Sequence, residues 1–393
     1  MMRITAQYFN INRVLLLAVG LWPYQQSKVD RFRFIFFLSI LTTAILFQFT
    51  SFFNSKCSAD FVMKILSSSL FFTTFVIKYI FFAINAGSIK HLLAQLQHVY
   101  DQLKDECENA IVEKYNCSAK RFTIVITSLF ICSIFALIVA QLWSNIIAVV
   151  LSRNVSQARR LPIITEYFVD QEKYFFLILL HLNAAFYIGM TVVVAIGTML
   201  ITYLVHTCGL FKISSYRIEH AMRAVMLQNI SAKNDALMLE EIKCAVDIHR
   251  QAMKLSKTLV SQFEAMLFCL IAAGVVSLSL NLFQIFQMAS NRNNIDEILF
   301  PSVLVFISIL YMFCANYVGQ NVTDHNSHVF VTVYNVQWYM APLYVQKLML
   351  FLLQRNGQDF TLGVGGLFIG SLECFATLVK ASVSYFTVIY STQ

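Results

Sequence analysis

The sequence predicts an all-α membrane protein with seven transmembrane helices, the N-terminus cytoplasmic and the C-terminus extracellular. Three observations lead to this class. Of the 393 residues, 58% are hydrophobic and only 13% are charged, which is far from the composition of a soluble domain. Seven apolar segments are each long enough to cross a bilayer as a helix, which takes about 20 residues. The basic residues gather in alternate connecting segments.

The seven spans follow one another along most of the chain. They are predicted at residues 32–53, 61–86, 122–151, 174–206, 258–288, 298–318 and 363–391. Ahead of them lies a short apolar run, residues 14–22, which Pro23 ends. It is too short to cross a bilayer, so we expect an interfacial or re-entrant helix there.

Three connecting segments have the period of amphipathic helices. In residues 87–103 apolar side chains recur at intervals of three and four, beginning at Ile89, so we expect the second helix to continue into water. Residues 207–257 are polar and periodic, which predicts that the fourth and fifth helices extend into one bundle on that side. A further amphipathic helix is expected at 343–353, after Pro342.

The distribution of Lys and Arg orients these spans. With the N-terminus inside, cytoplasmic segments hold 19 of the 29 basic residues, external segments hold six, and the spans hold the other four. Because basic residues concentrate on the cytoplasmic side of membrane proteins, this count favours that orientation. The net charge of +8 therefore follows the two sides of a membrane, and we expect the lipid bilayer, and no nucleic acid, as its partner.

Motifs of enzyme chemistry are missing from the sequence. It has no Walker loop, Rossmann glycine pattern or GxSxG elbow, and its nine cysteines form no CxxC pair. We expect neither an enzyme nor a bound cofactor. Asp324, His325 and His328 lie close together in the sequence. A structural polar network is favoured over a metal site, because no HExxH motif or histidine box accompanies them.

The last span, residues 363–391, has one side that is small and hydroxylic. Its only charges, Glu373 and Lys380, are seven residues apart and lie on one face of a helix. Small residues let membrane helices pack closely, whereas charges at membrane depth face protein or water. From this segment alone, a packing helix is favoured over a pore-lining one. We expect Lys380 to pair with Glu373 instead of lining a lumen.

A metabotropic seven-helix receptor is the alternative with the same number of spans. It predicts an external N-terminus, against the charge count, and usually has proline-kinked helices. The four prolines here, Pro23, Pro162, Pro301 and Pro342, all lie at the edges of the predicted segments. No span contains the arginine array of a voltage sensor, and no paired broken helices indicate an inverted-repeat transporter.

Short motifs in residues 206–222 and 316–392 indicate a family. They are His206-Thr-Cys208-Gly209-Leu210-Phe211, Tyr216-Arg217-Ile218-Glu219, Asn316-Tyr-Val-Gly-Gln320, Asp324-His325, Tyr334, Trp338-Tyr339, Pro342-Leu343, Gln346-Lys347-Leu348, Leu353-Gln354-Arg355 and Lys380-Ala-Ser-Val-Ser-Tyr385-Phe386. Together they resemble the insect odorant receptors, in the style of those of ants, bees and wasps. Ser384 and Ser391 stand where the related gustatory receptors carry Thr and Gln. A gustatory-type ligand-gated channel remains a further alternative.

The resemblance implies a subunit of an odorant-gated, non-selective cation channel in the plasma membrane of olfactory sensory neurons. It implies a heterotetramer with the odorant receptor co-receptor, and this chain resembles the ligand-tuning subunit, since it lacks the co-receptor's long loop between spans four and five. Residues 1–318 would hold the first six helices with the ligand-binding bundle and the cytosolic extensions. Residues 319–393 would hold an anchor segment and a seventh helix that lines the pore. This reverses the preference for a packing helix that the last span alone suggested.

The same resemblance places a site for a small volatile odorant in the outer half of the bundle, between helices two, three, four and six. The predicted ligand-binding residues are Phe71, Phe72, Phe75, Ala136, Val139, Ala140, Trp143, Ile178, His181, Leu182, Phe306, Ile307 and Tyr311, with Ser68 and Phe175 beside them. Trp143 and Tyr311 are favoured because each offers a large ring and a hydrogen-bond donor. About half of such residues are expected to be ordinary packing contacts.

The resemblance also assigns the path of the permeating cations. The predicted pore residues are Ser384, Val388, Ser391 and Thr392, of which Val388 matches the main gating position. A ring of apolar side chains closes a pore by excluding water, and hydroxyls beside it support hydrated ions. In this topology Asn154 is the one sequon that faces outside, so it is the predicted glycosylation site.

Overall fold

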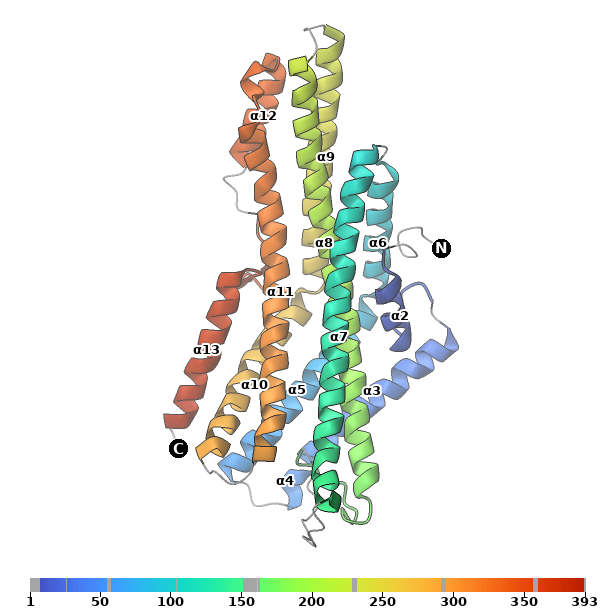
Figure 1. Ribbon diagram of the computed structural model, residues 1–393, viewed down its shortest axis with the longest axis vertical. Coiled ribbons are helices and arrows are strands. Elements are labelled where there is room, and N and C mark those ends of the chain that lie inside the picture. Colours follow the sequence, from blue (N-terminus) through green and yellow to red (C-terminus); the bar gives the residue numbers. More distant parts are fainter. Residues whose placement is uncertain are drawn as a thin grey trace.

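Long helices running roughly along one axis make up nearly all of the structure (Figure 1). It is a computed structural model that describes residues 8–25, 27–54, 58–103, 105–150, 161, 163–227, 232–290, 295–355 and 360–391. The elements are α2 (Asn10–Ala18), α3 (Lys28–Phe49), α4 (Ser51–Asn54), α5 (Ala59–Ile84), α6 (Ala86–Asp101), α7 (Glu106–Val150), α8 (Phe175–Leu227), α9 (Ala232–Gln262), α10 (Glu264–Ser290), α11 (Ile295–Asn335), the short 3-10 helix η1 (Trp338–Met340), α12 (Leu343–Arg355) and α13 (Leu372–Ser391), with the strands β1 (Gly363–Val364) and β2 (Phe368–Ile369).

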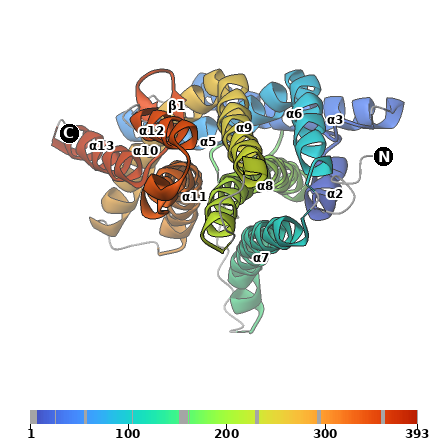
Figure 2. The same ribbon diagram turned by 90° about the horizontal axis from the view of Figure 1, so that it is seen from above.

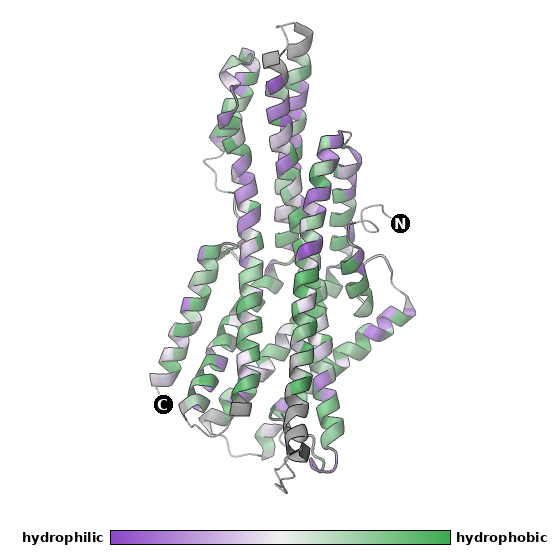
Figure 3. Ribbon diagram, in the orientation of Figure 1, coloured by the Kyte–Doolittle hydropathy of each residue, from purple (hydrophilic) through white to green (hydrophobic). Residues whose placement is uncertain are grey.

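Seven of the described helical segments are long and apolar enough to cross a membrane. They lie in α3 with α4, and in α5, α7, α8, α10, α11 and α13, so the seven spans predicted from the sequence are confirmed. Figure 3 shows that the lower half of the molecule is mostly hydrophobic, whereas polar residues gather on the upper parts of α6 to α9, α11 and α12. The charge count assigns this upper end to the cytoplasm.

Local sequence signals set several helix boundaries. The side chain of Ser27 accepts from the backbone N–H of Asp30, whose carboxylate accepts in return from the Ser27 backbone. This capping box begins α3. The Ser58 side chain accepts from the Phe61 backbone and begins α5. Asn85 separates α5 from α6, so the predicted continuation of the second helix is interrupted by one residue.

The fourth span extends far beyond a bilayer, as predicted, whereas the predicted extension of the fifth is interrupted, because α9 ends at Gln262 and α10 begins at Glu264. Helix α8 runs on to Leu227 and α9 begins at Ala232, and the two pack against each other along the polar end. Helix α11 also projects, because it continues to Asn335. The predicted domain boundary at residue 318 therefore falls inside a continuous helix. Pro301 also lies inside α11, which begins at Ile295, and not at a segment edge as predicted.

Two predicted elements differ in the structure. Residues 363–369 form the strands β1 and β2, paired as a hairpin, and not the start of the seventh helix. The left-handed φ angles of Gly365 and Gly366, 62° and 67°, explain why this glycine-rich stretch turns instead of coiling. The short interfacial or re-entrant helix predicted at residues 14–22 corresponds to α2, which lies at Asn10–Ala18. It packs against α7 and α8 and buries Leu16 completely.

Helix α8 lies at the centre of the bundle. It contacts α2, α3, α5, α7, α9 and α11, and Figure 2 shows these elements around it with α13 at the far edge. Many of its side chains are fully buried, among them Ala185, Val192 and Phe211. The spaces between α8 and its neighbours therefore hold the core of the molecule.

Candidate functional site

A crevice of about 290 Å³ lies between the membrane helices and is lined by α5, α7, α8, α10 and α11. Helix α13 contributes Cys374 and Leu378 to its wall. At the polar end of the bundle the crevice reaches Leu204, Phe263 and Gly319. The volume is close to the lower limit of small-molecule sites in proteins, and the lining is mostly apolar, as such sites are. The crevice suits a small, largely apolar molecule.

An aromatic wall on α5 forms part of the crevice. Phe71 and Phe75, one helical turn apart, both line it, and their ring centroids lie 4.8 Å apart in an edge-to-face arrangement. Gly189 on α8 makes room for this wall, because a Cβ at that position would lie 2.0 Å from the Phe75 ring. The lack of a side chain at Gly189 thus determines how closely the Phe75 ring approaches α8.

Lys78 is the only charged side chain among the described residues that line the crevice. Its side chain is 4% exposed, and its Nζ lies 3.5 Å from the centroid of the Tyr311 ring. No ion pair among the described residues involves Lys78. Burying an ammonium costs several kcal/mol, whereas a desolvated cation–π contact contributes roughly 2 kcal/mol. The charge is therefore only partly compensated.

Five of the predicted ligand-binding residues line the crevice. Phe71 and Phe75 lie on α5, and the other three lie on α11: Phe306, Ile307 and Tyr311. They are brought together because α5 and α11 both pack around α8 and α10. Their role in binding stays a prediction, and the crevice extends beyond the outer half of the bundle in which it was placed.

Other predicted residues lie elsewhere. Phe72, Ile178 and Leu182 are buried among neighbouring helices and do not line the crevice. The two ring nitrogens of His181 lie 3.0 Å from the Thr43 hydroxyl and 2.7 Å from the Tyr167 hydroxyl. Burial raises the pKa of Tyr167 to about 12, so this hydroxyl keeps its proton in its hydrogen bond with His181. This triad joins α3, α8 and the segment before α8.

The remaining predicted residues are exposed, bond elsewhere in the core or lie outside the described part of the chain. Val139 on α7 is 40% exposed, and the Ser68 hydroxyl donates to Gln48 at 2.6 Å. Residues whose side chains the structure does not describe are Ala136, Ala140, Trp143, Asn154 and Thr392. Of the two favoured ring residues, Trp143 and Tyr311, only Tyr311 is therefore placed in the crevice.

Sequence reasoning missed several residues of the crevice. They include Thr74, Lys78, Ser133, Met190 and Thr198. A signal was available only for Lys78, because an ionisable residue at membrane depth is by default a functional candidate. The others are ordinary residues of membrane helices, and only the packing of α5, α7 and α8 shows that they share one space.

Helix α13 packs against α10 and α11 and leaves one face uncovered. The inner face holds Leu378 and Ser382, and the Ser279 hydroxyl donates to the Ser382 carbonyl at 2.9 Å. The uncovered face holds charged, hydroxylic and apolar side chains in one stripe, which are Glu373, Thr377, Lys380, Ser384, Thr387, Val388 and Ser391. Three of the four predicted pore residues belong to this stripe.

The expected pair between Glu373 and Lys380 does not form. Both side chains are exposed, and no ion pair joins these two described residues. Seven residues of helix separate them by about 10 Å along the axis, which is beyond the reach of an ion pair. Both charges therefore remain on the uncovered face of α13.

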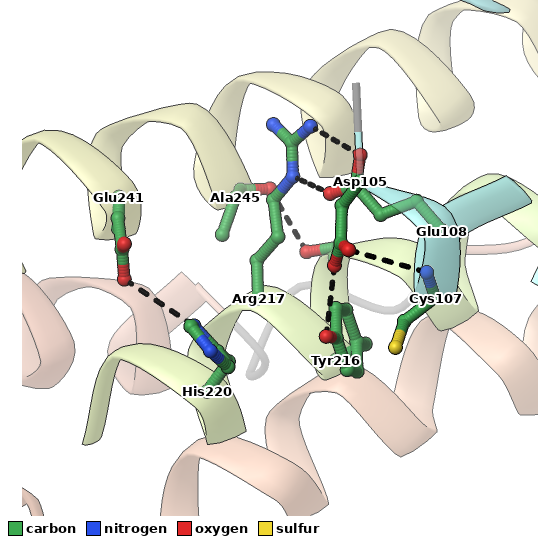
Figure 4. Close-up of polar contacts among 9 residues, drawn as sticks. Asp105, Cys107, Glu108, Tyr216, Arg217, His220, Glu241 and Ala245 are labelled. Carbon is green, nitrogen blue, oxygen red and sulfur yellow. Dashed lines mark hydrogen bonds and ion pairs between the residues drawn. The ribbon is translucent and has the colours of Figure 1, made fainter. Parts of the chain in front are cut away.

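A polar cluster at the cytoplasmic end joins α7 to α8 and includes motif residues that carried the family resemblance (Figure 4). The Arg217 guanidinium makes a bidentate contact with Glu108, one of its bonds being 3.0 Å long. The Tyr216 hydroxyl donates to Asp105 at 2.8 Å and holds the pKa of that carboxyl below its usual range. These contacts fix the register of α7 on α8.

One histidine of the predicted polar network, His325, bridges helices, and so does His249, which was not part of that prediction. His325 on α11 lies 2.7 Å from the Tyr115 hydroxyl of α7. His249 on α9 lies 2.9 Å from the Asn326 side chain of α11, in a buried position. No group of three possible metal ligands occurs among the described residues. These contacts join α11 to α7 and α9.

These features define a multi-pass helical membrane protein, with a central crevice and an uncovered last helix. The chain belongs to the 7tm Odorant receptor family, whose model matches residues 58–383. Its helices have the same arrangement as the insect olfactory receptor OR5 from Machilis hrabei, whose structure is known alone and in complex with eugenol. The TM-score is 0.75 at 15% identity, and the match covers 99% of this chain and 98% of that one.

Two curated relatives are similar over part of the chain. Odorant receptor 9a of Drosophila melanogaster is 21% identical over 207 residues, which is 53% of this chain and 49% of the relative. Odorant receptor 10 of Aedes albopictus is 23% identical over 130 residues, which is 33% of this chain and 35% of the relative. The family resemblance inferred from the motifs is confirmed, and the family consists of receptors and not of enzymes.

Proposed function

We propose that this protein is the ligand-tuning subunit of an odorant-gated, non-selective cation channel in the plasma membrane of olfactory sensory neurons. In this proposal a small volatile odorant binds in the crevice, and the subunit assembles with odorant receptor co-receptor subunits into a heterotetramer. The family membership, the apolar crevice and the uncovered face of α13 support this function.

The uncovered face of α13 is the observation that carries the proposal. Its stripe includes Glu373 and Lys380, and charged side chains facing lipid at membrane depth are costly. A neighbouring subunit or a water-filled path provides the partners that these two charges do not have among the described ion pairs. Val388, 57% exposed on the same face, supplies the apolar side chain that a dewetting gate requires.

The crevice adjoins the proposed pore helix. Cys374 and Leu378 of α13 line the crevice on the side opposite the exposed stripe. A ligand that fills the crevice therefore contacts the same helix whose other face lines the pore. In the proposed mechanism the ligand makes more contacts with α13 in the open channel than in the closed one. Because the ligand binds the open channel more tightly, it shifts the population toward that state.

Exposed apolar residues at the cytoplasmic end support the assembly. They lie on the last turn of α11, on η1 and on α12, and they are Tyr334, Tyr339, Met340, Leu343, Tyr344 and Phe351. Exposed apolar patches of this kind mark protein–protein interfaces. We assign this surface to the anchor between subunits, where the helix extensions meet.

Cysteine accessibility tests the pore assignment. Cysteines at Ser384, Val388 and Ser391 on the uncovered face are compared with Ser382→Cys on the face against α10, each expressed with the co-receptor. A membrane-impermeant thiol reagent applied during odorant exposure should reduce current at the first three positions and leave the Ser382→Cys channel unchanged. Equal protection of all four positions, with normal surface expression, would contradict the proposal.

Two pore substitutions give a second test. Val388→Ser should raise the ligand-free current, because a hydroxyl weakens an apolar seal, and Ser391→Glu should shift the permeability to divalent cations. Epitope tags on intact cells separate the channel from a metabotropic receptor. An accessible C-terminal tag with a hidden N-terminal tag is expected, and the reverse labelling would exclude the channel topology.

A further inference from the structure

Lys78 occupies a place in the crevice that packing alone does not explain. Its side chain lies on the face of α5 that also carries Phe71, Thr74 and Phe75, because these positions are three, four and seven residues apart along the helix. The face thus presents an aromatic surface that ends in an ammonium. Tyr311 of α11 covers the ammonium with its ring and offers no anionic group.

Three hydroxyl side chains that line the crevice with Lys78 bond to backbone carbonyls. The Thr74 hydroxyl donates to the Phe71 carbonyl at 2.7 Å, and Ser133 donates to the Leu129 carbonyl at 2.8 Å. Thr198 donates to the Val194 carbonyl, also at 2.7 Å. Each of these hydroxyls bonds within its own helix. The ammonium of Lys78, with three donors, is the strong donor that the crevice offers to a ligand.

From this arrangement we infer that the crevice selects small apolar molecules that end in a carboxylate, and that Lys78 binds this group. The carboxylate supplies the counter-charge that the buried ammonium lacks, and the apolar tail lies on Phe71 and Phe75. Charge-assisted hydrogen bonds are the stronger ones, and they gain further strength in a low-dielectric interior. This inference rests on the proposed function, since it names the ligand class of the same site.

Binding of octanoate and octanol tests the inference. The two probes share one chain length and differ in the group that Lys78 would recognise. Membranes from cells that express the full chain with the co-receptor should bind radiolabelled octanoate saturably. Lys78→Met should weaken octanoate binding by about tenfold or more, because it removes a bond between charged groups. Octanol binding should change by less than about threefold.

Two further variants serve as controls. Lys78→Arg keeps the charge and should retain most of the octanoate affinity. Lys64→Met removes the other lysine of α5, which does not line the crevice, and should leave both probes unaffected. Retained octanol binding and normal surface expression show that Lys78→Met is folded. Wild-type membranes that fail to bind octanoate, or an unchanged affinity in Lys78→Met, would overturn the inference.

Current recordings separate this inference from the proposed function. If neutral odorants open the channel while octanoate neither binds nor activates, the carboxylate site is wrong and the channel proposal stands. If octanoate binds in a Lys78-dependent manner but neither probe evokes current from surface-expressed complexes, the site stands and the proposed gating is contradicted.

Discussion

Helices α8 and α13 both cross the membrane, yet they relate to the rest of the chain in opposite ways. Within an apolar 18-residue segment of α8, 61% of the residues are buried. In the corresponding segment of α13, only 11% are buried. Helix α8 contacts six other helices of the chain, whereas α13 contacts α10 and α11. Hydropathy places both helices in the bilayer, but it does not distinguish a helix surrounded by its own chain from one that leaves a face uncovered.

The polar residues of the two helices show the same difference. On α8, Thr198, Thr202 and Ser214 are buried, and the Ser214 hydroxyl donates to the Ala245 carbonyl of α9. On α13, Ser384 and Thr387 are exposed, and the Thr387 hydroxyl bonds only within its own helix. The buried Ser214 of α8 therefore serves the fold, while the hydroxyls on the uncovered face of α13 remain available to a neighbour or to water.

The largest expected effect is on the anchoring of α8. Glu108→Ala should destabilise the protein by about 3 kcal/mol, because it leaves the half-buried Arg217 without its counter-charge. Asp247→Ala, which breaks an exposed pair with Arg250, is the control and should cost less than about 1 kcal/mol. Unfolding in mixed detergent micelles measures both. Equal losses would show that α8 is not anchored by this pair.

The contact between α8 and α5 provides the next test. Gly189→Ala should destabilise by about 1–3 kcal/mol and reduce odorant potency, because its Cβ would displace the Phe75 ring. At Gly197, on the same helix, no atom lies within 4 Å of an added Cβ. Gly197→Ala should therefore be neutral or slightly stabilising. Unfolding curves and dose-response curves with wild-type-like values for Gly189→Ala would refute this packing.

Substitutions at two nearby positions distinguish the buried face of α13 from its uncovered face. Ser382→Leu, on the buried face, should cost about 1–3 kcal/mol by overpacking against α10. Ser384→Leu, on the uncovered face, should change stability by less than about 0.5 kcal/mol and still alter the odorant-evoked current. The same unfolding assay, together with recordings at matched surface expression, checks this pair. A stability loss confined to Ser384→Leu would reverse the assignment of the faces.

The smallest expected effect concerns pH at the cytoplasmic end. The hydrogen bond from Tyr216 lowers the pKa of Asp105 in the folded protein. A carboxyl with a lowered folded pKa stabilises the fold above its unfolded pKa, and this contribution disappears as the pH falls through the folded value. Tyr216→Phe should therefore reduce stability slightly at neutral pH and match wild type well below about pH 4. A difference that persists in acid would mean that the hydroxyl acts by packing.

Part of the candidate site could be predicted because the family resemblance names the helices of the pocket and the topology gives their outer ends. Phe71 and Phe75 on α5, and Phe306 with Tyr311 on α11, were identified in this way and line the crevice. Periodicity could not show that His181 turns toward Thr43 and Tyr167, since that contact depends on how α3 lies against α8. It also could not show that Lys78 and Tyr311 meet, because they lie on helices far apart in the sequence.

By itself the sequence determined that the chain crosses the membrane seven times, which side each end faces, and to which family it belongs. These properties follow from local hydropathy, from charge in the connecting segments and from short motifs. Only the tertiary structure decided where the crevice lies, which charge it contains, and which face of α13 is uncovered. These depend on contacts between distant segments, such as Gly189 with Phe75 and Lys78 with Tyr311, and a residue's own neighbours in the sequence do not specify its neighbours in space.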